Sequence, residues 1–287
     1  MGTLATKNTK GQEVLAQEQF NKLQNFAKEH WGFDIHPNKK NLVENRLSSL
    51  CRKNKFSSPS EVLESLFKTD SKDLQILVFD SLSTNLTSFF RDPEHFDFFE
   101  KEILETFRKS KGLSKLRLWS AGCSIGCEPY SLAIQCKESL SASQLSKIYL
   151  LGTDYSVSVL AKAKEAVFPK ETVQKIQKDL LHRHFLKGVG KAEGKVKLKN
   201  EIQALVHFRL LNLMESLPGM EPFDAIFCRN VMIYFDENTQ ASLIKRLTEQ
   251  LKPGGWLFVG SAESLPRISS NLISVRPSIF QKQGGNS

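Results

Sequence analysis

The chain has 287 residues, of which 40% are hydrophobic and 25% are charged, a composition ordinary for a soluble globular protein. This length is enough for one large core and a smaller unit. No apolar run approaches the roughly 18 residues of a membrane span, and no basic-then-apolar leader opens the sequence. We therefore expect a cytoplasmic protein without membrane insertion.

The cysteines and the net charge restrict the metals and partners to be expected. Cys123 and Cys127 are four residues apart, and no further Cys or His pair completes a zinc site, so we expect no metal. The formal charge of +9 favours an acidic partner. An acidic protein surface explains this charge as well as nucleic acid does. Because no aromatic-interleaved RNA motif or zinc-finger spacing is present, we expect no nucleic acid.

Residues 12–82 have the pattern of a small helical domain. Apolar residues recur at helical spacing from Phe20 to Ala27, and Pro37 opens a second helix with Leu47 on its apolar face. Ser58 and Pro59 mark the entrance of a third helix. The region has no strand pattern, which predicts an all-α domain.

Strands and helices alternate along most of the remaining chain, after a connector at 83–112 with a helix following Pro93. The predicted strands are Leu116–Ser120, Ile148–Thr153, Ala225–Cys228 and Trp256–Gly260, and predicted helices begin at Pro129 and Ser156. This alternation over 113–287 is typical of a doubly wound α/β sheet, which binds its ligand at the carboxyl ends of the strands.

One stretch, at about 186–210, interrupts the alternation. Glycines at 188, 190 and 194 precede the alternating segment Lys195–Lys199, and Val206–Arg209 is predicted to pair with it. The sequence therefore predicts a small antiparallel insert.

The turn Trp119–Pro129 follows a strand and opens a helix. Its small residues let the backbone approach a ligand closely, and helix N-terminal amides favour a carboxylate or phosphate. Such turns often serve only tight packing, and this one lacks the G-x-G-x-x-G order. The next strand ends at Asp154, which is placed to accept hydrogen bonds from ribose hydroxyls or, alternatively, to cap the following helix. Together, the two features favour a nucleoside-type cofactor.

Two later motifs separate the possible cofactors. Phe223–Asn230 is an apolar strand with polar residues just past its end, and Leu251–Leu257 is an L-x-P-G-G turn before a late strand. The pair is similar to the later half of S-adenosylmethionine methyltransferases. Nicotinamide-dependent dehydrogenases would require more phosphate-binding chemistry than this sequence offers.

Three longer motifs, Thr84–Arg91, Trp119–Ser131 and Phe223–Phe235, resemble the signatures of the CheR family, the chemotaxis receptor glutamate methyltransferases. The resemblance runs from about residue 15 to 282 with the motifs in order. It implies an N-terminal all-α domain and a Rossmann-like S-adenosylmethionine methyltransferase sheet with a small antiparallel β-subdomain. It also implies methyl transfer from S-adenosylmethionine to receptor glutamates, with S-adenosylhomocysteine as the product.

The sequence departs from the family pattern at three places. Ser83 stands where the family usually has Thr, and Cys127 replaces the first of two adjacent acidic residues. Gly260-Ser261-Ala262-Glu263 replaces a Gly-His-Ser-Glu pattern. These departures concern the fine tuning of the cofactor pocket.

The resemblance also implies roles for individual residues. It places cofactor contacts at Asn85, Thr87, Arg91, Gly122, Glu128, Asp154, Asn212, Leu213, Arg229 and Asn230. Arg91 is expected at the methionine carboxylate or the reacting region, Glu128 at the amino group and Asp154 at the ribose. Asn212 and Leu213 are expected to flank the adenine. The expected catalytic residues are Arg91 and Tyr234, the latter near the transferred methyl.

Two basic regions are candidates for binding the receptor. Lys39, Arg46 and Lys53 recur every seven residues beside the apolar face of a predicted helix. A solvated face is the alternative, but receptor methylation regions are helical and Glu-rich, which favours docking here. The turn containing Gly188, Gly190 and Gly194 resembles that of family members that bind a receptor's C-terminal peptide, by an extra strand at a sheet edge.

Other interpretations stay open. One is a methyltransferase of the same fold that acts on a small molecule or another protein, although the basic stripe argues against a small substrate. Another is a non-catalytic S-adenosylmethionine-sensing adaptor, which the retained Arg91, Asp154 and Tyr234 oppose. A nucleic-acid binder is suggested by charge alone. We expect a monomer.

Overall fold

The computed structural model describes residues 15–110, 115–217, 219–263 and 271–284, and divides into two compact units. The first contains the described residues up to Thr84 and the segment Tyr234–Asp236, and the second contains the rest. Within the described ranges, no helix is long and apolar enough to cross a membrane. The predicted domain limits at residues 12 and 112 lie outside the described residues.

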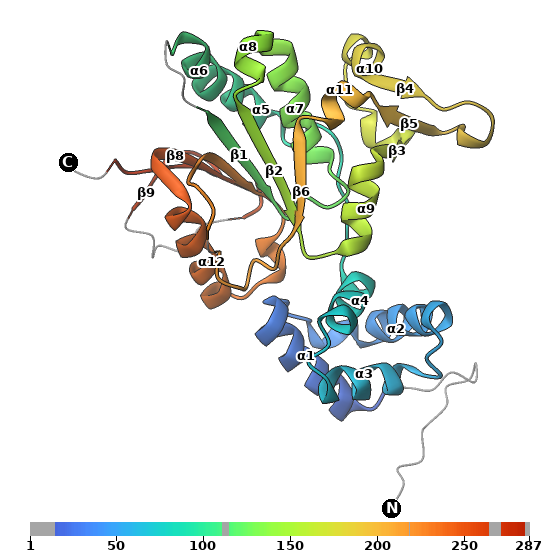
Figure 1. Ribbon diagram of the computed structural model, residues 1–287. Helices are drawn as coiled ribbons and strands as arrows, with labels where there is room; N and C mark the ends of the chain where they lie inside the picture. The colour runs from blue at the N-terminus through green and yellow to red at the C-terminus, as the bar shows by residue number, and fades with distance from the viewer. Residues whose placement is uncertain (1–14, 111–114, 218, 264–270, 285–287) are drawn as a thin grey trace, which may run out of the picture. The chain divides into compact units, whose positions relative to one another are not determined.

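The first unit is helical, as predicted (Figure 1). Its helices are α1 (Gln17–Trp31), η1 (Pro37–Lys39), α2 (Lys40–Asn54), α3 (Pro59–Lys68) and α4 (Lys72–Leu82). Local chemistry sets their ends: Gly32 terminates α1 in the left-handed conformation, and the side chains of Ser58 and Ser71 accept hydrogen bonds from backbone amides of α3 and α4. Phe20, Leu23 and their apolar neighbours are buried as the helical spacing requires.

The second unit is built on a seven-stranded sheet with the order β6-β2-β1-β7-β8-β10-β9. The strands are β1 (Leu116–Ala121), β2 (Ile148–Asp154), β6 (Val206–Leu210), β7 (Phe223–Cys228), β8 (Leu251–Val259), β9 (Leu272–Arg276) and β10 (Ile279–Lys282). All neighbours from β6 to β8 are parallel, and β10 is antiparallel to β8 and β9. The predicted α/β sheet and its four predicted strands are confirmed.

Helices precede the first strand and connect the later ones. They are α5 (Pro93–Phe98), the π-helix η2 (Phe99–Leu104), α6 (Glu105–Lys109), α7 (Cys127–Ser139), α8 (Ala142–Leu145), α9 (Val157–Glu165) and α12 (Glu237–Glu249). The helices predicted after Pro93 and Ser156 are confirmed, and α7 begins two residues before Pro129. Aromatic packing joins η2 to the sheet, since the Phe99 ring meets Phe227, which stacks on Phe258 at 4.2 Å.

The insert is a three-stranded antiparallel sheet, β3-β5-β4, beside the main sheet (Figure 1). Its elements are β3 (Val167–Pro169), η3 (Lys170–Val173), α10 (Lys178–His184), β4 (Phe185–Lys187), η4 (Gly190–Ala192), β5 (Lys195–Leu198) and α11 (Asn200–Gln203). The expected alternation along β5 is confirmed, because Val196 and Leu198 are buried whereas Lys195 and Lys197 are exposed.

The predicted partner of β5 is wrong. Val206–Arg209 lies in β6, which pairs in parallel with β2 of the main sheet. The short helix α11 turns the chain away from β5, and Val206 is then buried in the core shared by both sheets. The strands that do pair with β5 are β3 and β4, so the insert begins earlier than predicted and ends before β6.

Successive strands of the main sheet are added first on one side of β1 and then on the other. From β1 the chain adds β2 and β6 on one side, and then returns to add β7 and β8 on the other side. Ligands of open α/β sheets bind outside the carboxyl ends of the strands at such a point. The residues that follow β1, β2, β6 and β7 are therefore the place to search for the site.

Candidate functional site

The turn after β1 is held in an unusual backbone conformation. Gly122, Ser124 and Gly126 have φ values of 75°, 50° and 90°, all left-handed. A Cβ on Gly122 would lie 2.4 Å from Cγ2 of Val231, in the loop after β7, so only glycine fits there. Non-glycine residues in this conformation cluster at functional sites, because the surrounding structure must hold them there.

Asp154, the last residue of β2, fixes this turn. One carboxylate oxygen accepts a hydrogen bond from the Ser124 amide at 2.8 Å, and the other accepts from the Ser156 amide at 3.0 Å. Asp154 therefore joins the turn to Ser156, and it is the side chain of Ser156, not that of Asp154, that caps α9. Each carboxylate oxygen can accept a further hydrogen bond, so the predicted ribose contact is compatible with these bonds.

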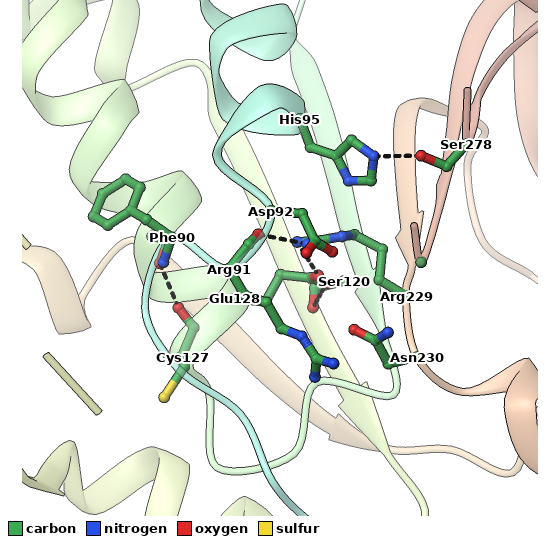
Figure 2. Close-up of polar contacts among 12 residues, drawn as sticks. Phe90, Arg91, Asp92, His95, Ser120, Cys127, Glu128, Arg229, Asn230 and Ser278 are labelled. Atoms are coloured by element: carbon green, nitrogen blue, oxygen red, sulfur yellow. Dashed lines mark hydrogen bonds and ion pairs between the residues drawn. The ribbon is translucent and has the colours of Figure 1, made fainter. Parts of the chain in front are cut away.

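A buried ion network links three segments at the same edge of the sheet (Figure 2). Arg229, directly after β7, donates to Glu128 on α7 at 3.0 Å and to Asp92 of the connector at 2.6 Å. Ser120 on β1 also donates to Glu128, at 2.7 Å. The Arg229 side chain is only 2% exposed and bridges the carboxylates of Glu128 and Asp92.

The network changes the pKa values of its members. Burial raises the pKa of Glu128, and the positive charge of Arg229 opposes that rise. Burial acts in the same direction on Asp92, but its hydrogen bond and charge interaction with Arg229 outweigh it, and the pKa of Asp92 is lowered. Arg229 was predicted to contact the cofactor, and the structure directs its guanidinium onto these carboxylates.

The connector packs along the glycine turn and α7. The carbonyl of Asn85 accepts a hydrogen bond from Ser124 Oγ at 3.5 Å, and Thr87 forms a side-chain hydrogen bond with Cys127. Burial raises the pKa of the Cys127 thiol to about 12, which makes it an inert structural cysteine. Arg91 is half-buried and donates from Nη1 to the carbonyl of Leu86 at 3.4 Å.

Aromatic residues of the connector anchor it. Phe89 is fully buried, with its ring centre 4.9 Å from that of Phe168 on β3 and 5.1 Å from that of Phe185 on β4. The next amide, of Phe90, donates to Ser131 Oγ on α7 at 3.0 Å. The connector is thus fixed to the small sheet on one side and to α7 on the other.

The residues after β6 lie beside the end of β2. The amide of Leu211 donates to the carbonyl of Asp154 at 3.0 Å. Asn212 and Leu213 follow directly and are buried, and the Asn212 side chain accepts from the Met214 amide at 3.0 Å. The structure therefore places these two predicted adenine contacts next to the predicted ribose contact.

Tyr234 belongs to the first unit. Its carbonyl accepts a hydrogen bond from the Asp34 amide at 2.8 Å, and its ring centre is 5.2 Å from that of Phe33. The second unit thus brings together the predicted cofactor residues of the connector, the glycine turn and the ends of β2, β6 and β7. A role for Tyr234 at the transferred methyl stays a prediction.

The predicted receptor-binding cations also lie in the first unit, and they differ from one another. Lys39 and Lys53 are exposed. Arg46 is half-buried, and its guanidinium donates to the carbonyls of Leu82 and Ser83 and to Thr84 Oγ1. Arg46 therefore holds the C-terminus of α4, a role that its place in the stripe does not indicate.

The glycines of the insert form the tip of the β4–β5 hairpin. Gly190 and Gly194 are exposed and left-handed, with φ values of 58° and 79°. A Cβ on Gly188 would lie 1.9 Å from the carbonyl oxygen of Ala192, so the turn requires glycine there. These glycines shape the hairpin.

Two residues of the site were missed by sequence reasoning as functional residues. Glu263 accepts hydrogen bonds from three backbone amides near the end of β8 and β7. His95, on α5, is fully buried and bonded to Ser278 at 2.7 Å (Figure 2). The signal for Glu263 was its place in the family-like motif Gly260–Glu263, just past the end of a strand. His95 had no signal, because its partner is far away in the sequence.

Comparisons with known proteins agree with this architecture. Residues 85–279 match the CheR methyltransferase SAM-binding domain, and residues 18–83 match the CheR methyltransferase all-alpha domain. A chemotaxis protein methyltransferase of Borreliella burgdorferi is 35% identical over 274 residues, covering 93% of this chain and 95% of the relative. One from Escherichia coli is 34% identical, covering 89% and 87%. The chain therefore belongs to the CheR methyltransferase family.

Proposed function

We propose that this protein transfers the methyl group of S-adenosylmethionine to glutamate side chains of chemotaxis receptors, as a protein-glutamate O-methyltransferase that releases S-adenosylhomocysteine. The observation that carries the proposal is the convergence of Asp154, Glu128 and the left-handed glycine turn where the strand order of the sheet reverses, in a chain of this family.

The side chains at this edge suit the cofactor chemically. Asp154 offers acceptors for ribose hydroxyls beside the buried pair Asn212 and Leu213, which would flank the adenine. Glu128 offers a carboxylate for the amino group, and Gly122 allows close backbone approach. When bound, S-adenosylmethionine supplies an electrophilic methyl on a sulfonium, and we expect no metal.

The chemistry asks little of the protein's side chains. A glutamate carboxylate is already ionised at pH 7, so no general base is needed to make it a nucleophile. In-line displacement then depends on alignment of the two reactants and on exclusion of water. Arg91 can bind a carboxylate and still hold Leu86, because a guanidinium has five N–H donors. We assign Arg91 to the methionine carboxylate or the incoming glutamate.

The receptor would bind through two surfaces. Lys39 and Lys53 are exposed cations on the first unit, suited to a Glu-rich helix. For a C-terminal receptor peptide, we place the added strand at β4, one of the two edge strands of the small sheet, because Leu186 on it is apolar and exposed. Leu186 and Val189, 53% and 77% exposed, provide apolar contacts at this edge.

The experiment that tests the proposal is incubation of receptor cytoplasmic fragments with methyl-labelled S-adenosylmethionine. Base-labile label on the fragments, absent when their methylation-site glutamates are changed to alanine, is the expected result. Label on a small molecule or on nucleic acid would contradict the proposal. Binding of S-adenosylhomocysteine without any transfer would favour the sensing adaptor.

A further inference from the structure

The carboxylate of Glu263 accepts hydrogen bonds from backbone amides that follow two neighbouring strands. It accepts hydrogen bonds from Gly260 at 2.5 Å, Asn230 at 3.0 Å and Ile233 at 3.1 Å. Gly260 follows β8, whereas Asn230 and Ile233 lie in the loop after β7. One side chain therefore fixes both ends of the segment Asn230–Ile233, which we name the β7 loop.

The β7 loop needs such a constraint. Asn230 has a left-handed φ of 59°, a conformation that few residues other than Gly, Asn and Asp adopt. Val231 of the loop fills the space that a Cβ on Gly122 would need. Hydrogen bonds from amides to an ionised carboxylate are about twice as strong as those between neutral groups. Glu263 thus stabilises this loop conformation through bonds from outside the loop.

Gly260 completes the arrangement. A Cβ at this position would lie 2.7 Å from both the side-chain nitrogen of Asn230 and an oxygen of Glu263. The space around the carboxylate is therefore filled by the loop itself. The negative charge of Glu263 also reaches the ion network, where it adds to the effect of burial in raising the pKa of Glu128.

We propose that Glu263 is a positioning residue for methyl transfer, which acts by holding the β7 loop against the glycine turn. The loop carries Asn230 and packs Val231 on Gly122, at the edge where we place the cofactor. Glu263 acts through backbone amides of the loop. Its loss should therefore disturb alignment in the transition state more than it weakens cofactor binding.

The test uses Glu263→Gln in the full chain. Glutamine has nearly the same shape, but it offers one acceptor oxygen and turns an NH₂ group toward backbone donors. One carboxylate oxygen accepts from Asn230 and Gly260 and the other accepts from Ile233, so the amides that face the new NH₂ group lose their acceptor. These amides should exchange with solvent about tenfold faster or more in the variant, with other amides of the second unit unchanged. The control is Glu165→Gln, at an exposed position at the end of α9.

The second measurement, of receptor methylation kinetics, rests on the proposed function. We expect Glu263→Gln to lower kcat for receptor methylation about tenfold, with the affinity for S-adenosylhomocysteine changed less than about threefold. If S-adenosylhomocysteine affinity, thermal stability and kcat fell in parallel, the role would be structural only and the proposal overturned. Unchanged exchange at the three amides would also overturn it.

The test still gives an answer if the variant does not fold or if the protein methylates no receptor fragment. If Glu263→Gln does not fold, Glu263→Asp keeps the charge with a shorter reach, and the same readouts apply with smaller expected effects in the same direction. If the unaltered protein methylates no receptor fragment, the proposed function fails, whereas amide exchange still tests whether Glu263 holds the β7 loop.

Discussion

The guanidinium of Arg229 donates to the carboxylate of Glu128 over 3.0 Å, and this bond joins the end of β7 to the start of α7. Because Arg229 also bonds to Asp92, one buried cation is the counter-charge shared by two carboxylates from different segments. Removing the cation would leave two largely buried carboxylates without the counter-charge they share.

Arg229→Met should therefore lower the free energy of unfolding by about 3–5 kcal/mol. The measurement is urea unfolding at pH 7. As a control, Lys109→Met removes one partner of an exposed ion pair with Glu105 and should cost no more than about 1 kcal/mol. Equal losses of unfolding free energy in the two variants would show that the Arg229 network does not stabilise the fold more than an exposed ion pair does.

Asp154→Asn should weaken the binding of S-adenosylhomocysteine by about 1.5–3 kcal/mol, because hydrogen bonds to a charged acceptor are replaced by weaker ones. Titration calorimetry measures this loss. Asp179→Asn, at an exposed position on α10, is the matched control and should leave the affinity unchanged. Unaltered affinity in Asp154→Asn would remove Asp154 from the cofactor site.

Sequence patterns predicted the sheet and the glycine turn because both depend on local order: apolar strands, small residues and helix starts. They did not predict that Arg229 turns onto Asp92, since the two residues are 137 positions apart. Pairing of β6 with β2 was missed for a similar reason. A strand's alternation shows which face is buried, but not which neighbouring strand it will join.

His95 makes the second unit sensitive to acid. Burial and the nearby charge of Arg229 lower its pKa to about 4 from the ordinary 6.5. Its Nε2 donates to Ser278, whose hydroxyl donates to the carbonyl of Pro277, and with so low a pKa the folded-state histidine is neutral at pH 7. The unfolded chain therefore takes up a proton at a higher pH than the folded chain.

Since the folded-state pKa is depressed, the stabilisation is present above pH 6.5 and is lost as the pH falls towards 4. The free energy of unfolding should fall by about 2 kcal/mol from this group between pH 7.5 and pH 5. Urea unfolding of the protein and of His95→Gln at both pH values isolates the contribution. The same pH dependence in both proteins would contradict it.

The three cations of the basic stripe should have two different roles: receptor binding for Lys39 and Lys53, and stability of the helical unit for Arg46. Lys39→Glu with Lys53→Glu should raise the KM for receptor fragments and reduce its salt dependence, without changing thermal stability, because both side chains are exposed. Arg46→Ala should instead lower the free energy of unfolding by about 1–3 kcal/mol through its lost bonds to Leu82 and Ser83. Lys68→Glu on α3 is the control for added negative charge. A double variant with unchanged KM would make the stripe a solvated face.

The small sheet offers the sharpest test of a receptor tether. If a C-terminal receptor peptide pairs with β4, then Leu186→Asp with Val189→Asp should weaken its binding at least tenfold, since two exposed apolar contacts become charged, each change worth about 1 kcal/mol or more. Val167→Asp lies on β3, the opposite edge of the same sheet, and is the matched control. The measurement is fluorescence anisotropy with labelled C-terminal peptides from the host's receptors. Weaker binding in Val167→Asp alone would move the tether to β3. If no peptide binds the unaltered protein, the small sheet has no tethering role, and receptor recognition rests on the first unit.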